Sequence, residues 1–171
     1  MISKSNLRKG LLFEKWLLDN VFVRHKKNPR KYDIDLIKPG FPGVEAKLES
    51  CKRAKLLPNG EQKYLAVQLF VAKTTGPLKL SGPWKSFEED HSSLYVVGKK
   101  KGSSYKFLMI TTSIELLKAC EDYMPGGPKH TPENLLFFEN QKIVALVPLA
   151  DLQHINRDVN WALDFVYRDR D

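Results

Sequence analysis

Two short segments that alternate apolar and charged side chains, with a turn between them, constrain this chain most. They are YDIDLI at residues 32–37 and VEAKLE at residues 44–49, and KPGFPG joins them. Alternation with a period of two is typical of a β-strand, and a short connection rich in Gly and Pro favours an antiparallel hairpin. Such a hairpin can bring Asp35 close to Glu45 and Lys47, which share one face of their strand.

Charged groups in strands that otherwise have core composition need a partner. Carboxylates and amines are rarely buried unless an opposite charge, a hydrogen bond or a metal ion compensates them. The alternative is that Glu45 and Lys47 lie on a solvated face of the sheet and pair with their neighbours. Asp33 shares a strand face with Asp35, and we expect it to be a solvated or supporting carboxylate rather than a metal ligand.

A helix is expected at the N-terminus, ending at about Asp19. On a helical wheel Leu7, Leu11 and Leu18 form one stripe, which we expect to be buried. Glu14 lies on the same stripe, and no cationic side chain stands three or four residues from it. We therefore expect the partner of Glu14 across the core, with an ordinary ion pair on the helix surface as the alternative.

The remaining patterns predict a single α/β domain over residues 1–171, with a helix first and the central strands covered by helices. Apolar runs predict further strands at residues 21–25, 93–98, 105–112 and 142–152. Thr112 and Glu115 have the spacing of a capping box, which predicts a helix from there to about Met124.

Three segments have weaker patterns. Residues 64–72 fit a buried strand or a short helix equally well. Residues 74–90 have the composition of a loop with one helical turn near the end, and residues 158–171 form a mixed, charged tail.

Charge and cysteine content narrow the class of protein. Lys and Arg number 28 against 20 Asp and Glu, which gives a net charge of +8 and favours a polyanionic partner, with a merely basic protein as the alternative. The two cysteines make no disulfide framework or paired zinc motif, so a reducing, cytoplasmic location is expected. No signal peptide or membrane span is visible in the pattern.

Asp35, nine further residues and then Glu45-Ala46-Lys47, after a helix that carries Glu14, resemble the PD-(D/E)xK nuclease superfamily. The resemblance covers residues 7–49 well. It implies a restriction-endonuclease-like core, in which helices flank a central mixed sheet. Ile34 stands where the motif has proline, a position that varies within the superfamily.

The resemblance implies a Mg²⁺-dependent DNA endonuclease that leaves a 5′-phosphate and a 3′-hydroxyl, with Mn²⁺ as a possible substitute. Asp35, Glu45 and the backbone carbonyl of Ala46 offer the hard oxygen ligands that Mg²⁺ prefers. Lys47 can orient the attacking water or offset phosphate charge, and a lowered pKa would also suit it as a base. Glu14 is expected to face the metal, directly or through water.

Basic residues near the motif are candidates for contact with the phosphate backbone, although a solvated turn explains them equally well. They are Arg24, Lys26, Lys27, Arg30, Lys31, Lys52 and Arg53. Gln68 is a candidate polar helper of the site.

The expected partner is DNA, with no nucleotide cofactor and no membrane. A homodimer is expected if both strands are cut, because one chain holds one site. Restriction-type and junction-resolving activities both stay open, as do RNA cleavage and exonuclease action. The competing class is a non-catalytic, basic nucleic-acid-binding module with the same fold.

Overall fold

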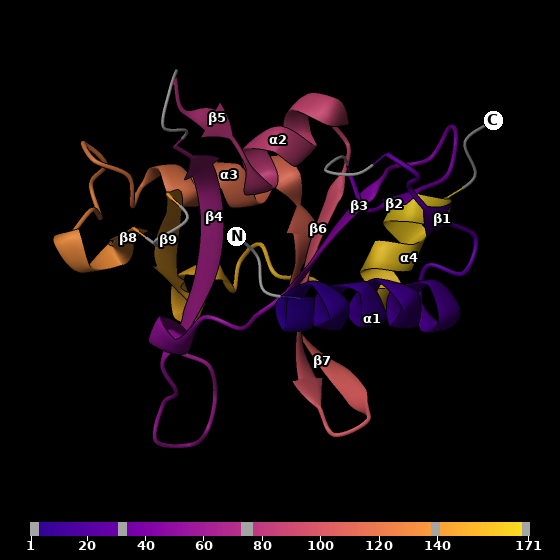
Figure 1. The fold of residues 1–171 in the computed structure, drawn as a ribbon, viewed down its shortest axis with the longest axis horizontal. Coiled ribbons are helices and arrows are strands. Elements are labelled where there is room, and N and C mark those ends of the chain that lie inside the picture. Colours follow the sequence, from indigo (N-terminus) through magenta and orange to yellow (C-terminus); the bar gives the residue numbers. More distant parts are fainter. Residues whose placement is uncertain (1–3, 31–33, 73–76, 138–140, 169–171) are drawn as a thin grey trace.

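A computed structural model describes residues 4–30, 34–72, 77–137 and 141–168 (Figure 1). Within these ranges the protein is a mixed α/β structure with two β-sheets. Its four α-helices are α1 (Lys4–Asn20), α2 (Gly82–Glu89), α3 (Ser113–Glu121) and α4 (Val159–Tyr167). None of these helices is both long and apolar enough to cross a membrane.

The first sheet has five strands and is mixed. Its order is β1 (Lys26–Lys27), β2 (Leu36–Ile37), β3 (Val44–Leu48), β6 (Leu94–Lys101) and β7 (Ser104–Thr112). Only the central pair, β3 and β6, is parallel. The predicted hairpin is confirmed, because β2 and β3 are antiparallel with Leu36 opposite Val44. The strands predicted at residues 93–98 and 105–112 are confirmed as well, and they form the antiparallel pair β6 and β7.

A second sheet has four antiparallel strands, so the expectation of one central sheet is only partly right. Its order is β5 (Lys79–Leu80), β4 (Tyr64–Val71), β9 (Lys142–Pro148) and β8 (Leu135–Phe137). The ambiguous residues 64–72 therefore belong mainly to a strand. Pairing with β9 along the whole of β4 supplies hydrogen bonds that no local pattern reveals.

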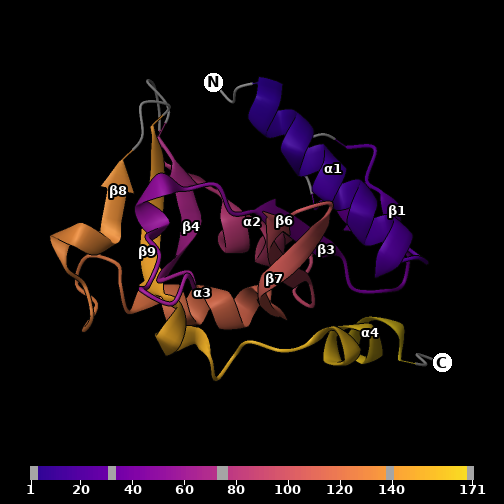
Figure 2. The same ribbon diagram turned by 90° about the horizontal axis from the view of Figure 1, so that it is seen from below.

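The core consists of two main clusters on opposite faces of the mixed sheet (Figure 2). One face, with Val44 and Val96, packs against α1 and α4. The other face, with Tyr95 and Val97, packs against α3 and the second sheet. Because Glu45 lies opposite Tyr95 in the register, it belongs to the face that looks toward the second sheet.

The buried face of α1 differs from the prediction. Phe13 and Leu17 are fully buried, whereas Leu7 and Leu11 are 49% and 38% exposed. The wheel identified a real apolar stripe, but the helix packs through a neighbouring face about 120° away. The predicted burial of the Leu7–Leu11 stripe is therefore wrong.

Other boundaries also differ from the sequence predictions. Residues 21–25 form turns rather than a strand, since Val21 and Phe22 both donate to the carbonyl of Leu17. The expected loop at 74–90 contains the two-turn helix α2, which is longer than the one helical turn expected there. The charged tail contains α4, whose N-cap Asp158 accepts from the Trp161 N–H and whose inner face is buried. The Thr112 cap of α3 is confirmed, although the helix ends at Glu121 rather than Met124.

Candidate functional site

The hairpin of β2 and β3 brings the three motif side chains together. Asp35 lies directly before β2, and its Oδ2 accepts a hydrogen bond of 2.8 Å from the N–H of Ala46. This bond takes the place of a strand–strand bond and holds the Asp35 carboxyl against β3. Glu45 and Lys47, on either side of Ala46, form an ion pair of 3.2 Å.

Glu45 is a buried carboxylate with partners from two elements. Its residue is 8% exposed, and its Oε2 accepts a 3.0 Å hydrogen bond from Ser86 Oγ of α2. Burial raises the pKa of Glu45 to about 8, the hydrogen bond and charge of Asp35 add to this, and the Lys47 charge opposes it. Burial therefore favours the protonated form of this carboxyl, whereas the Lys47 ammonium beside it favours the ionised form.

Glu14 approaches the same place from α1. Its carboxyl lies within hydrogen-bonding reach of Asp35, which in turn lies within reach of Glu45. Burial is the first cause of the raised pKa of both Glu14 and Asp35, and nearby carboxylate charge raises each further. The predicted partner of Glu14 across the core is thus Asp35, and three carboxyl groups converge.

Lys47 extends from the buried carboxyls toward solvent, with 50% of its side chain exposed. The negative charge of Glu45 is the main cause of the raised pKa of Lys47. Because half of the side chain is in water, solvent screens this attraction. A lowered pKa was one of the roles expected for this lysine, but here the ammonium form is favoured, which suits charge compensation better than proton abstraction.

The hairpin places together several oxygen atoms that could bind a metal ion. The backbone carbonyl of Gly43 and the backbone N–H of Glu49 form hydrogen bonds with β6. Backbone groups alternate in direction along a strand, so those of the odd-numbered residues of β3 point toward β6, and those of Ala46 point toward Asp35. The Ala46 carbonyl therefore lies on the Asp35 side of the strand, beside two carboxylates. This donor set suits Mg²⁺ or Mn²⁺. Within the described ranges, however, no three His, Cys, Asp or Glu side chains already have the geometry of a metal site.

Besides Ser86, two further residues at the site were not predicted. Tyr95 of β6 lies opposite Glu45 in the parallel register and is buried, and burial raises its pKa. Lys142 of β9 lies close enough to Lys47 that the Lys47 charge, after burial, lowers the pKa of Lys142. Both come from strands far away in the sequence, so only long-range pairing brings them here.

Gln68, the candidate polar helper of the site, forms a side-chain hydrogen bond with the start of α2 rather than with the carboxylates. Its Nε2 donates to Ser81 Oγ at 2.6 Å, at the N-cap of α2. This bond fixes the start of the helix that carries Ser86. Within the described residues Gln68 therefore supports the Glu45 partner indirectly.

Two of the predicted basic residues interact with other groups of the protein. The Arg24 guanidinium stacks on Phe41 and Tyr167, 5.3 and 5.1 Å from their ring centroids, which limits its use for phosphate binding. Lys27 lies near enough to Glu14 to lower the pKa of that carboxyl. Both of these basic residues are exposed, as are Lys26, Arg30, Lys52 and Arg53. Lys31 and Asp33 lie outside the described residues.

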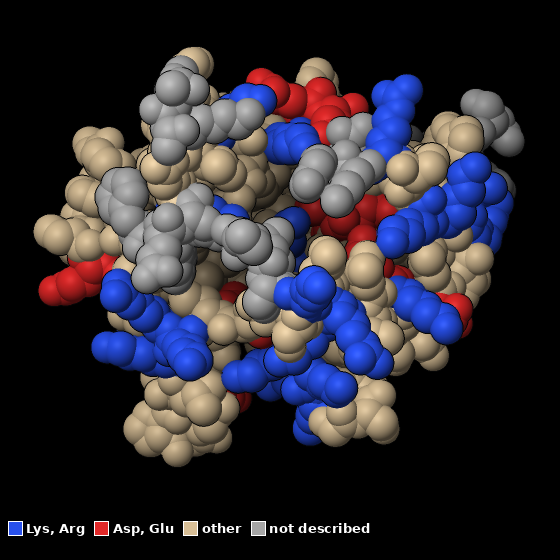
Figure 3. All heavy atoms as spheres, in the orientation of Figure 1, with Lys and Arg blue, Asp and Glu red and all other residues tan. Residues whose placement is uncertain are grey.

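The charge pattern on this face is visible in Figure 3. Carboxylates gather near the middle of the face, and Lys and Arg side chains surround them.

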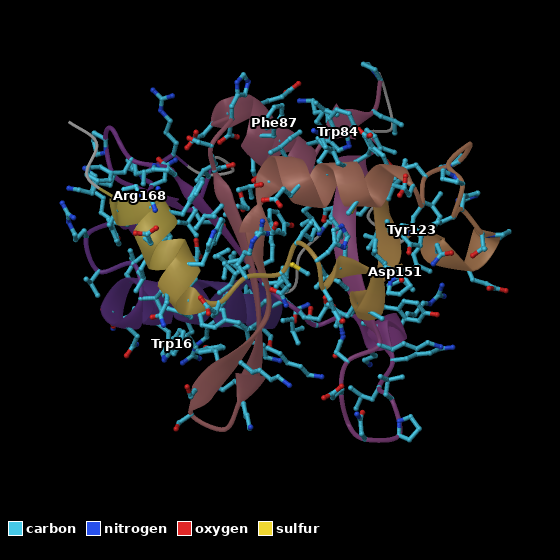
Figure 4. The ribbon with its side chains drawn as sticks, turned by 180° about the vertical axis from the view of Figure 1, so that it is seen from behind. Trp16, Trp84, Phe87, Tyr123, Asp151 and Arg168 are labelled. Carbon is cyan, nitrogen blue, oxygen red and sulfur yellow. The ribbon has the colours of Figure 1, made fainter. Side chains whose placement is uncertain are left out.

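The opposite face holds a second, smaller feature, in which Tyr123 and Asp151 point toward each other (Figure 4) and share a hydrogen bond. The Trp16 ring packs against Phe107 and the Trp84 ring packs against Phe70.

Comparison with known proteins gives no family assignment. A scan against protein-family models, a search of curated proteins and a search of solved structures each found no match.

Proposed function

We propose that this protein is a divalent-metal-dependent nuclease that hydrolyses phosphodiester bonds in DNA, with a restriction-endonuclease-like core in its mixed sheet. The observation that carries the proposal is the Asp35–Ala46 hydrogen bond beside the Glu45–Lys47 ion pair. It joins two carboxylates, one carbonyl and one ammonium at a single point of a protein whose net charge is +8.

Asp35, Glu45 and the Ala46 carbonyl are the residues that would hold Mg²⁺ or Mn²⁺. A bound ion of this kind supplies charge stabilisation for the phosphate and lowers the pKa of a coordinated water. Lys47 contributes a fixed positive charge beside the scissile phosphate. Glu14 holds a proton or a water against Asp35, which keeps that carboxyl oriented.

A non-catalytic nucleic-acid-binding module is the second candidate. It is favoured by the existing Glu45–Lys47 ion pair and by the lack of a ready-made metal cluster among the described residues. In that case the buried carboxylates are stabilised by Lys47, Ser86 and shared protons alone. A homodimer belongs to the first candidate if both DNA strands are cut.

Incubation of the protein with supercoiled plasmid, branched DNA, single-stranded DNA and RNA, each in millimolar Mn²⁺, tests the proposal. We expect cleavage of at least one DNA substrate, with 5′-phosphate ends and complete loss in EDTA. Cleavage of RNA alone would change the proposed substrate from DNA to RNA. Tight DNA binding without cleavage of any substrate would favour the binding module.

A further inference from the structure

The first half of α1 is a helix with almost no tertiary packing. Residues 4–12 are all exposed except Gly10, which is half-buried. In Figure 2 the N-terminal end of α1 stands clear of both sheets. Two helical turns are only marginally stable in water by themselves, and this segment exposes three large apolar side chains, Leu7, Leu11 and Leu12.

The exposed leucines share a helix face with the site. At 100° per residue, Leu7, Leu11 and Glu14 fall within an arc of about 60°. Glu14 reaches Asp35 at one end of this arc. Leu11 and Leu7 continue the same face outward by one and two turns, so the stripe leads away from the candidate active site.

A cationic stripe runs beside the leucines. Lys4, Arg8 and Lys15 fall within about 40° of one another, next to Leu11, and residues 4–13 contain no acidic side chain. A partner with both anionic and apolar parts matches this surface. A second copy of α1 would place the same cations against each other, which disfavours a self-paired helix.

We propose that the Leu7–Leu11 stripe binds unpaired bases of the nucleic-acid substrate while Lys4 and Arg8 contact the flanking phosphates. The inference rests on the proposed function, and it assigns branched or partly single-stranded DNA as the substrate class. Apolar side chains pack against base faces, which are available where strands are unpaired and covered where they are stacked in a duplex. Plain duplex DNA engages only the cations.

The test is binding in EDTA, measured by fluorescence anisotropy with a flap or three-way-junction DNA and with a duplex of the same strand. The variant Leu7→Gln/Leu11→Gln keeps helix propensity and removes the apolar surface. The matched control is Leu56→Gln/Leu78→Gln, which changes two exposed leucines on other segments. Thermal unfolding checks that each variant is folded.

We expect the double variant of α1 to lose about tenfold in affinity for the branched DNA, with duplex affinity and the control unchanged. Arg8→Gln should weaken binding to both DNAs and reduce its salt dependence. The inference would be overturned if the wild type bound both DNAs with equal affinity, or if the double variant of α1 lost equal affinity for both. The nuclease proposal would still stand in either case. Failure to bind any DNA would remove both.

Two other occupants have their own readouts with the same variants. Sedimentation that shows a wild-type dimer and a monomeric α1 variant would assign the stripe to a second copy. Binding to anionic phospholipid vesicles that the α1 variant loses, with DNA binding intact, would assign it to a membrane surface. Either result contradicts the inference.

Discussion

The carboxyl of Asp35 and the backbone of Ala46 are joined by a 2.8 Å hydrogen bond, although 11 positions separate the two residues in the chain. The bond places an acidic side chain where a neighbouring strand would otherwise supply a backbone carbonyl. It fixes the Asp35 carboxyl on β3 between the Glu14 and Glu45 carboxyls. The geometry of the candidate site therefore depends on this one acceptor.

Asp35→Ala should destabilise the protein by about 1–3 kcal/mol, because the Ala46 N–H loses its acceptor in a partly buried position. Asp35→Asn keeps a side-chain oxygen at this position and should retain most of the stability. Urea denaturation in EDTA measures both variants. Equal stability of Asp35→Ala and the wild type would show that the bond does not hold the hairpin.

Glu45→Gln should stabilise the metal-free protein at pH 9 by about 1–3 kcal/mol. The pKa of Glu45 is raised from 4.5 to about 8, so the folded state binds more protons than the unfolded state between these values. The stabilising effect of this proton is present below pH 4.5 and is lost as the pH rises through about 8. The neutral amide removes the loss.

Thermal unfolding at pH 6 and pH 9 in EDTA measures this effect. Glu61→Gln, which changes an exposed glutamate, is the matched control. A Glu45→Gln protein with the same decline between the two pH values as the wild type would contradict the assignment of a buried, protonated carboxyl.

The pKa of His25 should lie below its ordinary value of 6.5 in the folded protein. His25 is buried, its Nε2 lies 2.8 Å from the Pro42 carbonyl, and its Nδ1 lies 2.8 Å from the Tyr167 hydroxyl. These partners fit an imidazole that donates from Nε2 and accepts at Nδ1. Burial is the first cause of its lowered pKa, and the Lys38 and Arg24 charges lower it further.

Because the pKa of His25 is lowered, the unfolded state binds more protons below pH 6.5, and stability falls as the pH decreases through this range. An NMR titration of the His25 ring measures the pKa directly. Tyr167→Phe removes the donor to Nδ1, so the pKa of His25 should rise in that variant. An unchanged His25 titration in Tyr167→Phe would contradict the hydrogen bond.

Gly82→Ala should destabilise the protein by about 2 kcal/mol or more. Gly82 has a φ of +55°, and a Cβ there would lie 1.9 Å from the backbone oxygen of Gln68. The start of α2 must therefore move away from β4, which displaces Ser86 from Glu45. Gly10→Ala is the control, since its Cβ would meet nothing within 4 Å.

Chemical denaturation of the two glycine variants gives the comparison. A Gly82→Ala protein as stable as Gly10→Ala would show that β4 and α2 are not in close contact. A Gly82→Ala protein with wild-type stability and a changed environment around Glu45 is also not expected, because the movement of α2 causes both effects.

The hairpin and the approach of Glu14 could be predicted because they depend on local alternation and on one helix face. The α3 cap could be predicted for the same reason, since Thr112 and Glu115 are three residues apart. Ser86, Tyr95 and Lys142 could not, because they reach the site through strand pairing and helix packing over long sequence distances. Nothing in a local pattern specifies these contacts.

The wrong prediction for α1 has a physical cause as well. A wheel shows two adjacent apolar faces, one with Leu7 and Leu11 and another with Phe13 and Leu17. Only the position of the helix over β3 decides which one is buried, and residues 4–9 are exposed. The prediction of a charged tail missed α4 because this helix is short and charged residues flank it, Asp158 before it and Arg168 after it.

The central claim is that Asp35, Glu45 and Lys47 act on a phosphodiester through a divalent ion, and one paired measurement tests it most directly. Mn²⁺ binding by calorimetry and DNA cleavage in Mn²⁺ are measured on the wild type, Glu45→Gln and Lys47→Met. We predict that Glu45→Gln loses both, while Lys47→Met keeps Mn²⁺ binding and loses cleavage by at least about 100-fold. Undiminished cleavage by both variants would contradict the account.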